Sequence, residues 1–180
     1  MGWTGMYETF NSKLDAVIAS EGFKREDIVA SNIQGRVVNL AYRVADGRVI
    51  GVVCLVETRN ARTNPETMVK AMDEQMGPYE CCASVKVLDA LTPTDHEYAT
   101  RWRAQCRARL EQAKITRERA KALVIGARRR LVMDLGLRIG KFAAGSEVRI
   151  LKLTRTHAVV AGWVNVRLSK QRLLMVSEAV

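Results

Sequence analysis

Apolar residues first recur at helical spacing and then switch to the pattern of buried strands. A helix is predicted over residues 5–23, with Gly22 as its stop signal. Two runs rich in β-branched residues follow at 36–44 and 49–56, and the Asp46-Gly47 pair between them signals a hairpin turn. Both runs are apolar on both faces, which favours interior strands covered on two sides, or on one side with a partner on the other. The residues expected to be buried are Phe10, Leu14, Val17 and Ile18 in the helix and Leu40, Tyr42, Val53 and Leu55 in the hairpin.

Two shorter helices are predicted next. Asn64-Pro65-Glu66 has the residue types of a helix start, so a helix is expected to run to about Met76. Its apolar stripe is rich in methionine, which is typical of core packing, with a soft protein-binding groove as the alternative. This stripe consists of Met68, Val69, Met72 and Met76.

The second of these helices is predicted over residues 85–91, with a strand as the alternative.

The longest predicted element is a helix over residues 95–135. It opens at Thr92-Pro93-Thr94-Asp95, and its apolar face is centred on Trp102. Thr116 could cap a second helix, so a break near 114–116 is an alternative. The other residues of this apolar face are Tyr98, Cys106, Ala113, Ala120, Val124, Ala127 and Leu131.

The last segment, residues 136–180, has the pattern of short strands joined by tight turns. Such strands can close into a small SH3-like or OB-like barrel. The predicted fold class is therefore α+β, with a core over 1–94, the long helix over 95–135 and a β-rich unit over 136–180. The predicted strands are Glu147–Leu153, His157–Val160, Trp163–Leu168 and Arg172–Val176.

Positive charge is concentrated in the second half of the chain. The net charge is +10, but residues 1–100 carry −4 and residues 101–180 carry +14. Such asymmetry indicates an acidic partner, which would be nucleic acid, an anionic surface or an acidic protein. The alternative is that the charge only keeps the protein in solution.

Four of these cations recur every seven residues along the predicted long helix. Seven residues are close to two helical turns, so Arg107, Lys114, Lys121 and Arg128 would line one flank over about 32 Å, near the length of one turn of duplex. A stripe of this kind suits phosphate contacts, while a solvated helix face is the alternative. The full set of candidate binding residues is Arg103, Arg107, Lys114, Lys121, Arg128, Arg129 and Arg130.

The final segment adds further cations and two aromatic residues, Phe142 and Trp163. With so few aromatics available for a core, we expect both to be buried. The alternative is that they are exposed among the cations, an arrangement that holds single-stranded nucleic acid. The cations are Arg138, Lys141, Arg149, Lys152, Arg155, Arg167, Lys170 and Arg172.

The residues for catalysis or metal binding are sparse. The chain has two histidines, His96 and His157, and none of the common catalytic or nucleotide-binding motifs. The cysteines form no CxxC pair, and the sequence shows no secretion signal. We therefore expect reduced thiols, no metal, no cofactor and a cytoplasmic protein. One alternative is a zinc site formed by Cys81, Cys82, His96 and Cys106, and another is a Cys81 or Cys82 nucleophile with His96 as its base. The four cysteines are Cys54, Cys81, Cys82 and Cys106.

Three motifs occur in a distinctive order in residues 1–110: MGWTG at 1–5, MGPYECC at 76–82 and LDALTPTD at 88–95, with Trp102-Arg103 after them. This order resembles a family of small phage, plasmid and integrative-element proteins without an established activity. The resemblance implies a mobile-element protein, with DNA handling or inhibition of host defence as its roles.

These observations together predict a non-enzymatic, nucleic-acid-associated accessory protein of a phage or mobile element. The alternative is an inhibitor of a host defence system, of the anti-CRISPR or anti-restriction type, that acts by protein–protein binding. Neither prediction includes a membrane.

Overall fold

The computed structural model describes residues 12–57, 66–71, 80–137 and 140–180. Contacts divide the chain into two compact units, Met1–Glu111 and Gln112–Val180, and the division falls within the longest helix. Helices and antiparallel sheets occur together, which confirms the predicted α+β class. The predicted segments 1–94, 95–135 and 136–180 do not coincide with the two units.

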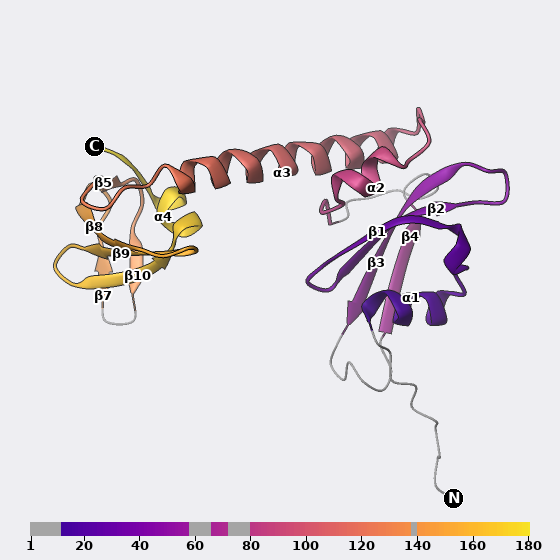
Figure 1. Cartoon of the computed structure of the whole chain (residues 1–180), viewed down its shortest axis with the longest axis horizontal. Coiled ribbons are helices and arrows are strands. Elements are labelled where there is room, and N and C mark those ends of the chain that lie inside the picture. Colours follow the sequence, from indigo (N-terminus) through magenta and orange to yellow (C-terminus); the bar gives the residue numbers. More distant parts are fainter. Residues whose placement is uncertain (1–11, 58–65, 72–79, 138–139) are drawn as a thin grey trace, which may run out of the picture. The chain divides into compact units, whose positions relative to one another are not determined.

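The first unit is built on a four-stranded antiparallel sheet with the order β1-β2-β3-β4 (Figure 1). Each strand pairs with the next one in the chain, so the sheet is a simple meander. The elements of this unit are α1 (Lys13–Glu21), the 3₁₀ turn η1 (Arg25–Asp27), β1 (Ile28–Gln34), β2 (Val37–Arg43), β3 (Val49–Glu57), β4 (Glu66–Ala71), α2 (Val85–Asp89) and α3 (Glu97–Lys121), which continues into the second unit.

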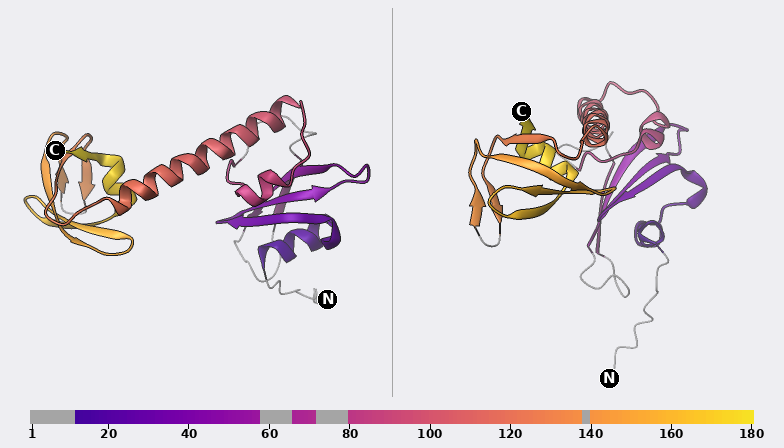
Figure 2. Two further views of the ribbon diagram at one scale, coloured as in Figure 1. Left: turned by 45° about the horizontal axis from the view of Figure 1, so that its top comes forward. Right: turned by 60° about the vertical axis from the view of Figure 1, so that its left-hand side comes forward.

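Both faces of this sheet are covered, as the two-sided apolar pattern predicted. Val17 of α1 packs with Leu40 on one face, and Trp102 of α3 packs with Val53 on the other. Figure 2 shows α1 on one side of the strands and α2 on the other. Leu40 and Val53 are fully buried, while Leu55, which was expected in the core, is only partly buried. Tyr42 is likewise only partly buried.

The ends of α1 and the β2–β3 turn follow from their residues. Ser12 caps α1 by accepting from the Asp15 N–H, and Gly22 ends the helix with φ of 70°. In the predicted hairpin turn, Gly47 has φ of 86°, a value that favours glycine. The Val44 N–H donates to the Arg48 carbonyl at 2.9 Å and closes the turn. The remainder of the predicted first helix, residues 5–11 with Phe10, lies outside the described residues.

The helix predicted from Asn64 to Met76 is wrong where the structure describes it, because residues 66–71 form strand β4. β4 pairs with β3 in register, with Leu55 opposite Met68, and Val69 packs against the core under α1. Pairing with the edge of β3 overrides local helix propensity here. The ends of the predicted element, 64–65 and 72–76, lie outside the described residues.

The short helix expected over 85–91 is present as α2, but the helix predicted over 95–135 is too long. α3 ends at Lys121. Five residues later Gly126 adopts φ of 90°, which favours glycine, and its N–H donates to the Ile150 carbonyl at 2.7 Å, so the chain has already joined a sheet there. There is no break near 114–116, where the Thr116 hydroxyl donates to the Gln112 carbonyl within one continuous helix. The predicted apolar face holds at Trp102 and Cys106 but not farther along, where Ala113, Val124 and Ala127 are exposed.

The second unit contains a five-stranded antiparallel sheet with the order β10-β9-β8-β5-β11 and a two-stranded ribbon, β6-β7. Its core includes Phe142, Ile150 and Leu173. The pairings among the described strands do not close this sheet into a barrel, so the predicted barrel stays a prediction. The elements are β5 (Arg128–Leu131), β6 (Leu135–Leu137), β7 (Gly140–Phe142), β8 (Glu147–Leu153), β9 (His157–Ala161), β10 (Asn165–Ser169), α4 (Lys170–Val176) and β11 (Ser177–Ala179).

Three of the four strands predicted in residues 136–180 are present as β8, β9 and β10, and the fourth is wrong. Residues 172–176 belong to helix α4. Ser169 caps this helix by accepting from the Arg172 N–H at 3.1 Å, and Leu173 and Val176, three residues apart, share its buried face.

Candidate nucleic-acid interface

The net positive charge of the chain comes from the second unit. Residues 112–180 hold fifteen Lys and Arg against four Asp and Glu, a net charge of +11. Residues 1–111 hold fourteen against fifteen, a net charge of −1. A surface that attracts an anionic partner is therefore expected on the second unit.

Two of the predicted site residues lie in the first unit, on the first half of α3. The guanidinium of Arg103 is partly buried, and its Nη1 donates to the Thr92 carbonyl at 2.8 Å. Arg107 is exposed, and its Nη2 lies 3.1 Å from Oδ1 of Asp89. Arg103 therefore holds the loop that precedes α3, and Arg107 already has a carboxylate beside it.

Two more predicted site residues, Lys114 and Lys121, lie on the second half of α3. Both are exposed, and their spacing of seven residues places them on one flank of the helix. Nζ of Lys121 lies 2.8 Å from Oε1 of Glu118, and this hydrogen bond holds the pKa of the Glu118 carboxyl below its usual value. Of the predicted stripe, this pair is the part that is both helical and within the second unit.

The three consecutive arginines are on strand β5 and not on the helix, which corrects the predicted continuation of the stripe to Arg128. Arg128 and Arg130 are exposed on one face and share Glu147, at 3.9 Å and 3.4 Å. Arg129 alternates to the other face, where its Nε and Nη2 donate to the hydroxyl and carbonyl oxygens of Ser177 at 2.8 Å and 2.7 Å. These hydrogen bonds connect β5 to β11, which are paired strands. Partial burial lowers the pKa of the Arg129 guanidinium.

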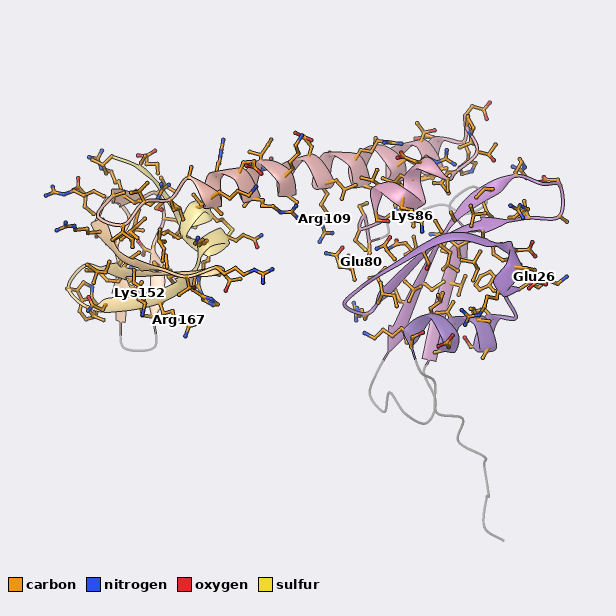
Figure 3. The ribbon with its side chains drawn as sticks, viewed as in Figure 1. Glu26, Glu80, Lys86, Arg109, Lys152 and Arg167 are labelled. Atoms are coloured by element: carbon orange, nitrogen blue, oxygen red, sulfur yellow. The ribbon has the colours of Figure 1, made fainter. Side chains whose placement is uncertain are left out.

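Strand pairing brings Arg128 together with three cations that the helical spacing did not select. Arg149 lies directly opposite Arg128 on the neighbouring strand β8. Lys152 of β8 and Arg167 of β10 both lie opposite Val159 of β9, the strand between them. Figure 3 shows the two residues near each other on this sheet. All four side chains are exposed and share the outer face of the sheet. We call this set, Arg128, Arg149, Lys152 and Arg167, the basic sheet face.

A β-bulge explains why this face was not found from the sequence. Alternation along β8 would put Arg149 and Lys152 on opposite faces, because they are three residues apart. The register shifts between Ile150 and Lys152, so that Leu151 is the extra residue and Lys152 returns to the face of Arg149. Within the part of the chain that the structure describes, no carboxylate lies within ion-pair distance of Arg149, Lys152 or Arg167.

The two aromatic residues of the second unit differ in exposure. Phe142 is buried as expected, but Trp163 is 61% exposed, which overturns the expectation that both belong to the core. The two rings pack at a tilt, with their centroids 5.5 Å apart. The exposed indole is thus attached to the core through Phe142.

The histidines and thiols have local structural partners. The His96 ring accepts from the Ala99 N–H at 3.4 Å and caps α3, and the His157 ring lies 2.8 Å from the Thr156 hydroxyl. Burial raises the pKa of the Cys54 and Cys106 thiols to about 12, so neither forms a nucleophilic thiolate near neutral pH. Among the residues with described positions, no three His, Cys, Asp or Glu side chains are grouped to hold a metal ion.

Comparisons with protein-family models, with curated proteins and with solved structures found no match. The resemblance to mobile-element proteins therefore stays an expectation. None of the helices within the described ranges is both long enough and apolar enough to cross a membrane.

Proposed function

We propose that this chain is a non-enzymatic, nucleic-acid-associated accessory protein of a phage or mobile element that acts in the cytoplasm of the host. The basic sheet face supplies the main phosphate contacts, and Lys114 and Lys121 of α3 add to them. The observation that carries the proposal is the excess of positive charge on this face: Glu147 lies beside Arg128, but among the described residues no carboxylate lies within ion-pair distance of Arg149, Lys152 or Arg167.

The placement of these cations supports an anionic partner rather than a role in stability. Arg128 and Arg149 are directly opposite each other on paired strands, and like charges in this position destabilise a sheet. Phosphate groups bound between them would relieve the repulsion. Arginine and lysine contacts of this kind give affinity for nucleic acid without reading its sequence.

We also propose that the second unit is a small SH3-like barrel, one of the two barrels, SH3-like or OB-like, that the strand pattern predicted. Support comes from the chain order of the sheet. The last strand, β11, follows the helix α4 and returns to pair with the first strand, β5, while the β6-β7 ribbon stands between β5 and β8 in the chain. This fold hosts many unrelated functions, so the charge and not the fold carries the functional proposal.

The test is the salt dependence of binding. The affinity of the full chain for labelled single-stranded DNA, RNA and duplex is measured by fluorescence anisotropy over a range of salt concentrations. Changing Arg128, Arg149, Lys152 and Arg167 to Gln should weaken binding to every sequence about equally. The slope of log K against log salt should become shallower by up to about 3–4 units, since each contact contributes about 0.7 on single strands and 0.9 on duplex.

A matched variant controls for the loss of charge alone. Lys24, Arg36, Arg43 and Lys86 are exposed cations of the first unit, and their change to Gln removes the same charge. This variant should keep the slope of the parent protein. Absence of binding at low salt, or equal slopes for the two variants, would overturn the proposal and favour an acidic host protein as the partner, as in the inhibitor alternative.

A further inference from the structure

Trp163 is the feature of the second unit that phosphate binding leaves unexplained. It lies in the turn between β9 and β10, which the Ala161–Asn165 pair closes. The other aromatic residue of this unit, Phe142, is 2% exposed, whereas Trp163 is 61% exposed. An indole that stays in water lacks the large hydrophobic stabilisation that burial would give. The exposure of Trp163 therefore suggests a ligand that covers the ring.

The surroundings hold the indole in place. A Cβ on Gly162 would lie 2.3 Å from Cε1 of Phe142, and a Cβ on Gly140 would lie 3.2 Å from Cη2 of Trp163. Glycine at both positions therefore leaves the space in which the two rings pack. The exposed ring is supported by the core and by the β7 backbone, and ordering it for a ligand costs little further entropy.

Cations lie on the strands next to this aromatic position. Arg149 pairs in register with Ala161, the residue two positions before Trp163. Lys141 follows Gly140, and its Nζ lies 2.6 Å from Oδ2 of Asp134. A ligand that satisfies both features has a flat apolar group attached to an anionic backbone, which is the chemistry of a nucleobase in a nucleic-acid strand.

We propose that Trp163 stacks on an unpaired nucleobase, so that the preferred ligand of this protein is single-stranded nucleic acid. The inference rests on the proposed function and adds to it the strandedness of the ligand. In a duplex the faces of the bases are covered by their neighbours, so Trp163 gains nothing there. In a single strand each base has a free face, and stacking on an aromatic side chain tolerates any sequence.

The experiment compares three probes with and without Trp163. The probes are a labelled single strand of about 12 nucleotides, an abasic sugar–phosphate strand of the same length, and a duplex. Trp163→Ala should weaken binding to the single strand about 5- to 150-fold and leave the abasic strand and the duplex unchanged. The salt slope should not change, because no phosphate contact is lost.

Three further variants guard against a folding effect. Trp163→Leu keeps an apolar side chain against Phe142 without the aromatic face and should behave as Trp163→Ala. Trp163→Tyr keeps an aromatic ring and should retain most of the affinity. Met175→Ala removes another exposed apolar side chain of the same unit, 64% exposed, and should have no effect. Thermal unfolding by circular dichroism confirms that each variant is folded.

The outcomes separate the two proposals. Binding of all probes by the parent protein, with equal losses or no loss on Trp163→Ala, overturns base stacking and leaves phosphate binding intact. In that case the aromatic surface would suit a proline-rich peptide instead. Failure of every probe to bind at low salt overturns the proposed function, and the stacking inference with it.

Discussion

At the scale of single residues, replacing two glycines of the second unit by alanine is expected to have different effects on stability. Gly162→Ala should lower the free energy of unfolding by about 1–3 kcal/mol, because the new Cβ would lie 2.3 Å from Phe142. A Cβ on Gly136 would have no neighbouring atom within 4 Å, so Gly136→Ala should change stability by less than about 1 kcal/mol. Urea unfolding measures both, and equal effects would show that Phe142 does not occupy the space above Gly162.

A second residue-scale prediction concerns acid pH. Hydrogen bonds from Lys141 and from the Ala144 N–H lower the pKa of the Asp134 carboxyl below 3.8. Its contribution to the fold is therefore fully present above the unfolded value near 3.8 and is lost as the pH falls through the lower folded pKa. The amide of Ala144 should lose its hydrogen-exchange protection over that range.

Asp134→Asn is the control for this titration. The amide oxygen of Asn can still accept from the Ala144 N–H, but it does not titrate. The acid-dependent change at Ala144 should therefore disappear in this variant. Retention of the same pH response would assign it to another group.

At the scale of elements, the covered sheet of the first unit sets a graded prediction. Leu40 is fully buried under α1, so Leu40→Ala should cost about 2–5 kcal/mol. Leu55→Ala should cost less, because part of that side chain stays in water. Urea midpoints at constant m-value give both numbers, and a larger loss at Leu55 would contradict the described packing.

Binding can also be apportioned between the helix and the sheet. Lys152 and Arg167 changed together to Gln should reduce the salt slope more than Lys114 and Lys121 changed together. The reason is that Lys121 already donates to Glu118 and must give up that ion pair to reach a phosphate. A larger effect of the helical pair, measured by the same anisotropy titration, would favour the contacts that the seven-residue spacing predicted.

Local sequence patterns predicted those elements for which the local preference and the tertiary packing favour the same structure. The two-sided strands, the Asp46-Gly47 turn and β8 follow from periodicity and turn chemistry alone. The sequence misled where pairing across the fold decided the outcome, as in β4, and where the helical reading ran past Gly126. In α4 the Ser169 cap was the local signal that could have been used.

The candidate site was predictable in kind but not in composition. The charge asymmetry pointed to the second half of the chain, and the second unit does carry the excess. The four residues of the basic sheet face come from three strands, and the bulge at Leu151 decides that Lys152 joins them. Register and bulges depend on tertiary contacts, which single-sequence periodicity does not contain.

At the scale of the whole molecule, the proposed nucleic-acid binding belongs to the second of the two units. The first unit has nearly balanced charge and buries its one described tryptophan, Trp102, to 4% exposure. The second unit combines a net charge of +11 with an exposed indole. The two units are therefore expected to respond differently to a nucleic-acid ligand.

The decisive measurement for placing the binding surface on the second unit is an NMR titration. The isotopically labelled full chain is titrated with a single-stranded oligonucleotide, and the amide and indole signals are monitored. We expect shifts at Arg149, Lys152, Arg167 and the indole of Trp163, while the indole of Trp102 stays unmoved. Shifts confined to residues 12–111, or no shifts at low salt, would contradict the assignment.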